Sequence, residues 1–339
     1  MRPFAANTSD YAGDAVTLMP TDGFVAAGGL LSLVAWRDHP MAEAVRWRNA
    51  LLLQRARAED FTWTPPHFPE DFKVERRSPP PEFQRIVAAL ELSPDSDWNN
   101  ALKLAAHLTE HVEDQGPIQA DLITTYHAIR KGDGYCADFV RVFLALAHTR
   151  GLTARQWAFS FDGFGGHGHT LVEVFDRQRK KWLLVDVLNN FHVVDASSGE
   201  PLGVLEYRES LRAGGQTAIM RPNGPGRPGF VHEHKAIEYY QKGVTQWYLW
   251  WGNAVFSYDA HPLVRAVATL SRPLAHIAAI VAGVQPRMKI YETEENAGEV
   301  RSMFSLRRLL IVGAVVAVVL GAALIVQVVA SAGPLKAIR

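Results

Sequence analysis

The hydrophobic pattern of this chain changes its period at Gly151, and this change limits the possible folds more than any other feature. From residue 83 to residue 149, apolar residues recur every three or four positions, as they do on the buried face of a helix. After Gly151, the segments 152–160, 169–175 and 181–187 alternate with a period of two, which is typical of strands. Helices followed by antiparallel strands predict an α+β domain.

Four helices are expected before this change of period. The fourth begins at Cys136, the only cysteine of the chain, and stops at Gly151, a residue that suits the left-handed end of a helix. The thiol is therefore expected in the first turn of a buried helix. The expected helices are Phe83–Leu92, a helix capped by Asp97 that reaches Leu108, Ile118–Arg130 and Cys136–Thr149.

Proline and aromatic content divide the rest of the chain. Residues 1–80 are expected to be partly irregular, because several prolines near their end break regular structure. Residues 81–220 hold the predicted helices and strands and form the central domain. We expect residues 221–308 to be an aromatic-rich helical linker region and residues 309–330 to be a transmembrane helix.

The apolar segment Leu309–Ala330 is long enough to cross a membrane. Its 22 residues include one polar side chain, Gln327, and as a helix they would rise about 33 Å, against a hydrocarbon core of about 30 Å. A buried core helix is the alternative, but soluble helices are rarely this long and this apolar. Because only nine residues follow, the sequence predicts a single-pass C-terminal anchor.

Basic residues on either side of this segment indicate its orientation. Four lie within about 20 residues on its N-terminal side and two on its C-terminal side, and a basic flank favours the cytoplasm. The soluble part is therefore expected to be cytoplasmic. The six residues are Lys289, Arg301, Arg307, Arg308, Lys336 and Arg339.

Composition excludes several classes of protein. Basic and acidic residues number 35 each and form no long run of one sign, so the chain lacks the footprint of a nucleic-acid-binding protein. A single cysteine can form neither an internal disulfide nor a cysteine-based zinc site. The first seven residues lack the layout of a signal peptide, so export with cleavage is not expected.

Cys136, His169 and Asp186 supply the three parts of a nucleophilic device. A cysteine in the first turn of a helix faces unpaired backbone N–H groups and the positive end of the helix dipole, which favour the thiolate. An imidazole can take the thiol proton, and a carboxylate can orient the imidazole. The backbone N–H at Cys136 can also hold the oxyanion that forms when the sulfur attacks an acyl carbon.

The two strands that carry His169 and Asp186 are expected to form a hairpin. With a polar turn at residues 176–179, Phe175 pairs with Lys180, and the same register places His169 directly opposite Asp186. Opposite residues share a face with Cβ atoms roughly 4.5–5.5 Å apart, so the carboxylate can accept a ring N–H. A register slipped by one residue would turn Asp186 to the other face.

Several nearby residues have competing interpretations. His167 competes with His169 as the base, although motif and register favour His169. Asp138 is read as a helix-start or packing residue rather than an acid. Glu173 shares the face of His169 and could join a buried polar network or form an ordinary strand salt bridge. The glycine-rich stretch 163–168 is read as a loop of the site rather than a phosphate cradle, because no Gly-Lys-Ser/Thr ending follows.

Other aromatic and histidine residues are more easily explained by structure. His232 and His234 could bind a metal, but a solvated helix start is the simpler reading. Trp157 and Trp182 are expected in the core, with lining of the cleft as the alternative. The aromatic residues between 239 and 251 could form an interfacial belt at the membrane or pack over the central domain, and the sequence favours neither.

Four motifs in order resemble the transglutaminase-like superfamily, a branch of the papain-like cysteine enzymes. Over residues 85–205 the chain is similar in a Gly-x-Cys-x-Asp-Phe helix start, a Gly-Leu-x-Ala-Arg strand entry, a His-x-x-x-Glu-Val strand and a Trp-x-x-x-Asp strand. The resemblance implies a papain-like fold in which helices pack on an antiparallel sheet. The motifs span Gly134–Phe139, Gly151–Arg155, His169–Val174 and Trp182–Asp186.

The resemblance also implies roles for three side chains: Cys136 as nucleophile, His169 as base and Asp186 as orienter. The expected function is cysteine-dependent amide or peptide hydrolysis, or acyl transfer, through a thioester and without a cofactor or metal. The expected partners are a peptide, protein or other amide-bearing substrate and membrane lipid through residues 309–330. The alternative is a catalytically silent scaffold at the membrane that serves cell-envelope polysaccharide biosynthesis, an idea that rests on fold analogy alone.

Overall fold

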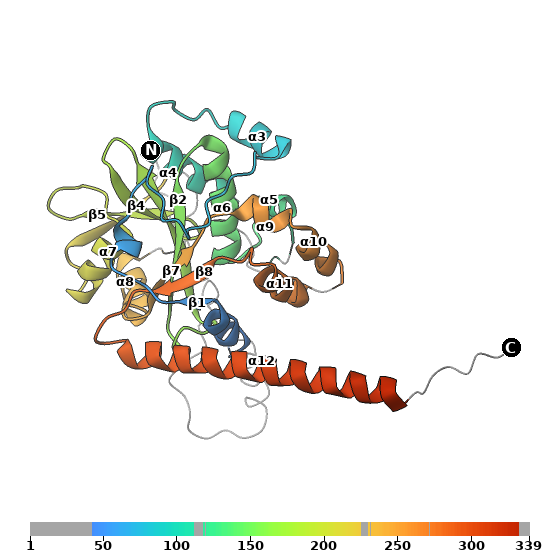
Figure 1. Cartoon of the computed structure of the whole chain (residues 1–339). Coiled ribbons are helices and arrows are strands. Elements are labelled where there is room, and N and C mark those ends of the chain that lie inside the picture. Colours follow the sequence, from blue (N-terminus) through green and yellow to red (C-terminus); the bar gives the residue numbers. More distant parts are fainter. Residues whose placement is uncertain are drawn as a thin grey trace, which may run out of the picture.

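A computed structural model of the chain (Figure 1) describes residues 43–111, 118, 120–224, 230, 232–270 and 272–331. Residues 1–42 of the expected N-terminal region and residues 225–229 of the expected linker region lie outside the described residues. The described part is a mixed helix and sheet structure that ends in one long apolar helix. The α+β prediction is confirmed.

One sheet of eight strands forms the centre of the described part. The strands are β1 (Leu53–Gln54), β2 (Ala154–Ser160), β3 (Gly168–Asp176), β4 (Lys181–Asp186), β5 (Phe191–Asp195), β6 (Ala218–Pro222), β7 (Trp247–Trp251) and β8 (Arg287–Ile290). Their order is β1-β8-β7-β2-β3-β4-β5-β6, and only the pairing of β1 with β8 is parallel. The three strands predicted from alternation, β2 to β4, are adjacent in the sheet.

Helices surround this sheet. A helix over residues 43–52 precedes β1. The others are α2 (Glu59–Thr62), α3 (Pro81–Ala88), α4 (Asp97–Leu108), α5 (Leu122–Ile129), α6 (Cys136–Arg150), α7 (Val204–Arg212), α8 (Glu233–Lys242), α9 (Val255–Asp259), α10 (Pro262–Ala268), α11 (Arg272–Val281) and α12 (Ala297–Ser331).

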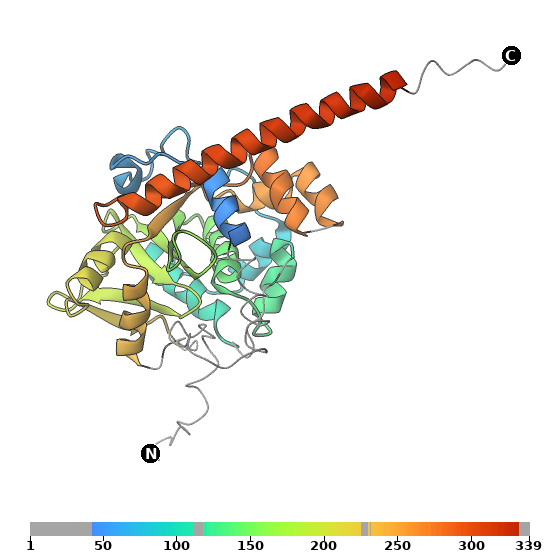
Figure 2. The same ribbon diagram turned by 90° about the horizontal axis from the view of Figure 1, so that it is seen from below.

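Two hydrophobic cores lie on opposite faces of the sheet. Val172 and Val174 of β3 pack with residues of α3 to α6 on one face, whereas Leu171 packs with residues of α7 and α8 on the other. Alternate residues of one strand thus enter different cores, which explains the period of two in the sequence. Figure 2 shows the same layers from below, with α6 and α8 on opposite sides of the strands.

Local capping moves the start of two helices from the expected positions. α4 is capped by Ser96, whose hydroxyl accepts a backbone N–H three residues on, and not by Asp97. The Asp97 carboxylate is buried and instead accepts two hydrogen bonds from Arg177 at 2.6 Å. α5 starts at Leu122, later than expected, because the side chain of Asp121 caps it there.

The aromatic segment near residue 250 forms a strand. Residues 247–251, expected within a helical linker region, form β7 and pair with β2 and β8. Trp247 and Trp251 are fully buried on the face of the sheet that carries Leu171. These rings therefore pack into the central domain and do not form a belt at a membrane surface. The expected domain boundaries stay a prediction.

A buried ion pair ties β2, β3 and α7 together. One carboxylate oxygen of Glu173 accepts from Arg155 (2.8 Å) and from the indole of Trp157 (2.6 Å), and the other accepts from the backbone of Val204 (2.7 Å). The Arg155 guanidinium also lies 4.2 Å from the centroid of the Trp182 ring. Glu173 is thus part of a buried polar network, one of its two expected roles.

We expect Glu173→Ala to destabilise the protein strongly. The substitution leaves the Arg155 guanidinium buried without its carboxylate, a situation that costs about 3–5 kcal/mol in other proteins. The melting temperature of the purified full chain should therefore fall clearly. Glu200→Ala is the control, because that carboxylate is 67% exposed and 3.5 Å from Arg179, so its removal should change little. Equal shifts for both variants would contradict the prediction.

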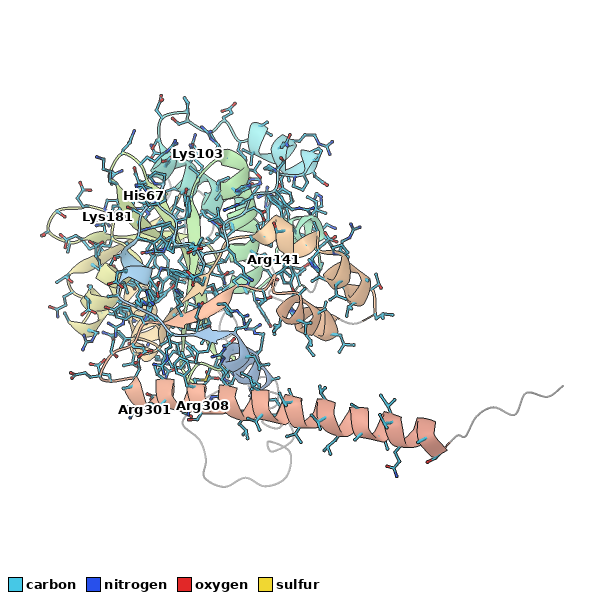
Figure 3. The ribbon with its side chains drawn as sticks, viewed as in Figure 1. His67, Lys103, Arg141, Lys181, Arg301 and Arg308 are labelled. Carbon is cyan, nitrogen blue, oxygen red and sulfur yellow. The ribbon has the colours of Figure 1, made fainter. Side chains whose placement is uncertain are left out.

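α12 runs without a break from the domain into the apolar C-terminal segment. Its first turns pack on the domain through Val300 and Met303, whereas Leu309 and the apolar side chains of residues 311–328 are exposed. The helix is long and apolar enough to cross a membrane. Figure 3 shows Arg301 and Arg308 on the part of α12 that lies against the domain. The apolar segment predicted from the sequence is thus one exposed helix that could span a membrane.

Candidate active site

Cys136 occupies the first position of α6, as expected. The preceding residue, Tyr135, has an extended backbone, and the carboxylate of Asp138 accepts the backbone N–H of Tyr135 at 3.0 Å. The same carboxylate accepts from the backbone of Ile118 at 3.3 Å. Asp138 is therefore a helix-start residue, as predicted. Cys136 itself is half-buried, so its sulfur is not sealed inside the core.

His169 and Asp186 are in direct contact. The Nε2–H of His169 donates to Oδ2 of Asp186 at 2.6 Å, and both side chains are almost completely buried. Gly168, the residue before His169, allows β3 to approach β2, because a Cβ at this position would lie 2.0 Å from the carbonyl oxygen of Phe159.

The hairpin register that brings them together differs from the predicted one by two residues. Phe175 pairs with Trp182 rather than Lys180, because the turn begins one residue later and the side chain of Asp176 accepts the backbone N–H groups of residues 178 and 179. Asp186 is therefore displaced along the strand and is not directly opposite His169. A shift of two residues keeps both side chains on one face, so the contact survives.

Two further residues hold the Asp186 carboxylate. The backbone N–H and the side-chain amide of Asn189 each donate to it at 3.0 Å, and the hydroxyl of Tyr240 on α8 also donates to it. Burial would raise the pKa of Asp186, but the charge of His169 and these hydrogen bonds lower it. The ionised carboxylate is therefore favoured although the side chain is buried.

The imidazole of His169 lies among aromatic rings. The rings of Phe159, Tyr239 and Tyr240 have their centroids 5.8–5.9 Å from it. Burial would lower the pKa of His169, but the charges of Asp186 and Cys136 and the hydrogen bonds to both raise it to about 10. The imidazolium form is therefore favoured between the carboxylate and the sulfur.

His167 lies in a different environment. Its Nδ1 is 3.0 Å from Oδ2 of Asp162, and half of its side chain is exposed. It does not line the cavity that contains Cys136 and His169. The structure therefore brings His169, and not His167, to the sulfur.

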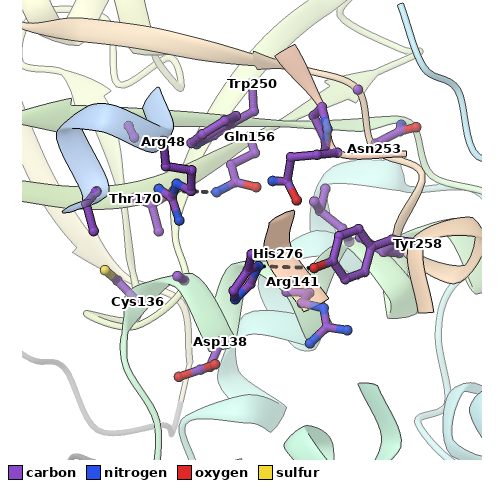
Figure 4. Close-up of a pocket in the computed structure, with 18 of the residues that line it drawn as sticks. Arg48, Cys136, Asp138, Arg141, Gln156, Thr170, Trp250, Asn253, Tyr258 and His276 are labelled. Atoms are coloured by element: carbon purple, nitrogen blue, oxygen red, sulfur yellow. Dashed lines mark hydrogen bonds between the residues drawn. The ribbon is translucent and has the colours of Figure 1, made fainter. Parts of the chain in front are cut away.

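A cavity of about 410 Å³ is lined in part by Cys136 and His169. Figure 4 shows Cys136 and Asp138 at the start of α6, with Arg48 and Gln156 across the cavity from them. The Arg48 guanidinium lies 5.7 Å from the centroid of the Trp250 ring, and its Nε and Nη2 share one oxygen of Asn49 at 3.3 and 3.0 Å. Among the described residues, no carboxylate forms an ion pair with Arg48.

The remaining candidates lie elsewhere or act in the core. His232 and His234 stack on each other, and within the described ranges no group of three His, Cys, Asp or Glu residues could hold a metal ion. Trp157 and Trp182 are buried core residues and do not line this cavity.

Sequence reasoning missed Tyr240, Asn189 and Arg48. Tyr240 belongs to the aromatic segment noted above, but its distance of 54 residues from Asp186 left no local signal for their contact. Asn189 follows Asp186 by three residues, which is the spacing of a carboxylate-capped turn and could have drawn attention. Arg48 carried no signal, since it is one of four arginines between residues 46 and 57.

Comparison with known proteins identifies the family of the central part of the chain. No curated protein matches the chain. The family model described as the transglutaminase-like superfamily matches residues 85–187, a range that includes Cys136, His169 and Asp186. This range covers α4 to α6 and the strands β2 to β4. The chain therefore contains a transglutaminase-like domain over residues 85–187.

Proposed function

We propose that this chain is a membrane-tethered cysteine enzyme that hydrolyses or transfers an amide-bound acyl group. One observation carries the proposal: His169 is buried between the Asp186 carboxylate and Cys136, at a cavity that can admit a substrate. A structural histidine needs neither a half-exposed thiol beside it nor an adjoining cavity.

The reaction proceeds through a thioester. The Cys136 sulfur attacks the amide carbon, and the backbone N–H groups at the start of α6 hold the resulting oxyanion. The C–N bond then breaks, and His169 gives its proton to the leaving nitrogen. Water or an acceptor amine next gives a proton to His169 and attacks the thioester, which releases the acyl group and restores the thiolate. Asp186 keeps the imidazole oriented through both steps.

We propose that the domain faces the cytoplasm. Four basic residues precede the apolar part of α12 and two follow it, and this imbalance favours retention of the preceding side in the cytoplasm. A silent scaffold remains the second candidate, because the transglutaminase-like match is compatible with loss of turnover.

Capture of an acyl-enzyme tests the proposal. The full chain in detergent is incubated with a panel of peptide and glutamine-type amides, and its intact mass is measured after rapid acid quench. We expect an acyl adduct on Cys136 that hydroxylamine removes, together with release of the amine. If no amide acylates Cys136 and iodoacetamide modifies it no faster than a free thiol, the enzyme hypothesis is wrong and the hypothesis of a silent scaffold takes its place.

Arg48 is expected to favour negatively charged reagents at the sulfur. Burial lowers the pKa of Arg48, but arginine starts so high that the guanidinium stays charged. In Arg48→Gln, the ratio of alkylation rates of Cys136 by iodoacetate and iodoacetamide should fall about five-fold or more, since one nearby charge is worth ~1 kcal/mol or more. Arg55→Gln, which lies against Phe304 outside the cavity, is the control and should leave the ratio unchanged.

A further inference from the structure

The α10–α11 hairpin carries four bulky apolar side chains on its outside. Leu274, Ile277 and Val281 follow one another at helical spacing on α11, and Leu270 precedes them in the same series. These four side chains are between 51% and 83% exposed. Within the described residues they belong to none of the hydrophobic cores.

The inner face of α11 shows the reverse composition. Ala275 and Ala279 are buried there against Val264 of α10. A helix that faces water normally buries its large apolar side chains and exposes small or polar ones. Apart from Ile280, which packs against a hydrophobic core, α11 does the opposite. This arrangement indicates that its outer face meets an apolar medium.

The apolar part of α12 lies beside this hairpin. Figures 1 and 2 both show α10 and α11 alongside the exposed, apolar half of α12. Ile280 of α11 and Leu310 of α12 also pack against the same hydrophobic core. A bilayer that surrounds the apolar half of α12 would thus lie next to the α10–α11 hairpin.

The charge of the surrounding segment suits a lipid surface. No acidic residue occurs between Asp259 and Glu292, whereas Arg265, Arg272 and Arg287 lie in this interval. A segment that holds basic residues and no acidic ones suits the headgroups of anionic lipids.

We propose that the α10–α11 hairpin inserts its outer face into the membrane interface beside α12. The inner side of the same hairpin, through Val264, Ala275 and His276, lines the cavity that contains Cys136. The cavity then opens close to the headgroups. Its substrate would be an amide attached to the membrane, a consequence that rests on the proposed function.

Site-specific fluorescence in nanodiscs tests this insertion. Cysteine is introduced at Ile277, at Val319 of α12 or at Lys235 of α8 in the full chain carrying Cys136→Ala, so that each variant has one thiol for the environment-sensitive dye NBD. The discs contain one copy of the chain in phosphatidylcholine and phosphatidylserine, with or without spin-labelled lipid. We expect the spin label to quench dyes at 277 and 319 several-fold more strongly than the dye at 235, with blue-shifted emission at 277.

Each result decides the question. Quenching at 319 but not at 277 would overturn the proposal and favour a protein partner for the exposed face of α11. Absence of quenching at both positions would overturn it together with the assignment of α12 as a membrane span. The fluorescence readout needs no turnover. Insertion at 277, with neither an acyl-enzyme nor fast alkylation of Cys136 in the unaltered chain, would therefore refute the proposed function alone.

Discussion

Cys136→Ala is expected to abolish acyl chemistry and to leave the fold intact. The substitution removes the only group that can form the thioester, and loss of a nucleophile in comparable enzymes lowers kcat by a factor on the order of 10⁶. The side chain is half-buried at the start of α6, so its truncation should cost less than about 1 kcal/mol of stability. Amine release from the best amide and the melting temperature of the full chain measure the two effects.

Cys136→Ser is the matched control for this prediction. It restores a side chain of nearly the same size, but a hydroxyl is a far weaker nucleophile than a thiolate at neutral pH. We therefore expect it to be as inactive as the alanine variant. Turnover that persists in both variants would show that the reaction does not pass through residue 136.

His169→Gln is expected to lower activity on the order of 10³-fold or more, whereas His167→Gln should change it little. Glutamine retains some of the volume of His169 but cannot give or take the proton that each step requires. His167 is half exposed and bound to Asp162, away from the cavity. The values of kcat/KM for one amide substrate measure both effects.

The rate at which Cys136 is alkylated can be measured without turnover and tests the two histidine variants independently of catalysis. Alkylation of Cys136 by iodoacetamide at neutral pH should slow in His169→Gln, because the imidazolium that stabilises the thiolate is lost. In His167→Gln the alkylation rate should match that of the unaltered protein. Equal effects of the two substitutions would mean that the choice of base is wrong.

The contact of His169 with Asp186 shows which errors a sequence prediction can tolerate. The predicted register was wrong by two residues, because the start of a polar turn cannot be located from Arg-Gln-Arg alone. The period of two still assigned both residues to one face, and an even shift preserves that assignment. The face of the sheet on which a side chain lies is encoded in the alternation of apolar and polar residues. The pairing register of two strands depends instead on where the turn between them begins.

The role of Tyr240 and the strand β7 are two features that local sequence patterns do not predict. The hydroxyl of Tyr240 reaches Asp186 only because α8 packs on the sheet, and no periodicity within either segment encodes that packing. β7 consists of aromatic residues and leucine, and both of its faces are buried, so it lacks the alternation by which a half-exposed strand is recognised. Neither the contact of Tyr240 with Asp186 nor the strand β7 could be predicted from local sequence.

The continuity of α12 limits how far the domain can reach. No proline interrupts residues 297–331, and the first turns of the helix are fixed to the domain by Val300 and Met303. A flexible linker would let a tethered domain sample a large hemisphere above its anchor, at a low effective concentration of any one target. In the membrane-tethered enzyme that we propose, a rigid connection would instead confine the thiol to a narrow range of heights above the bilayer. Its encounters with substrate would then become a two-dimensional search limited by lateral diffusion.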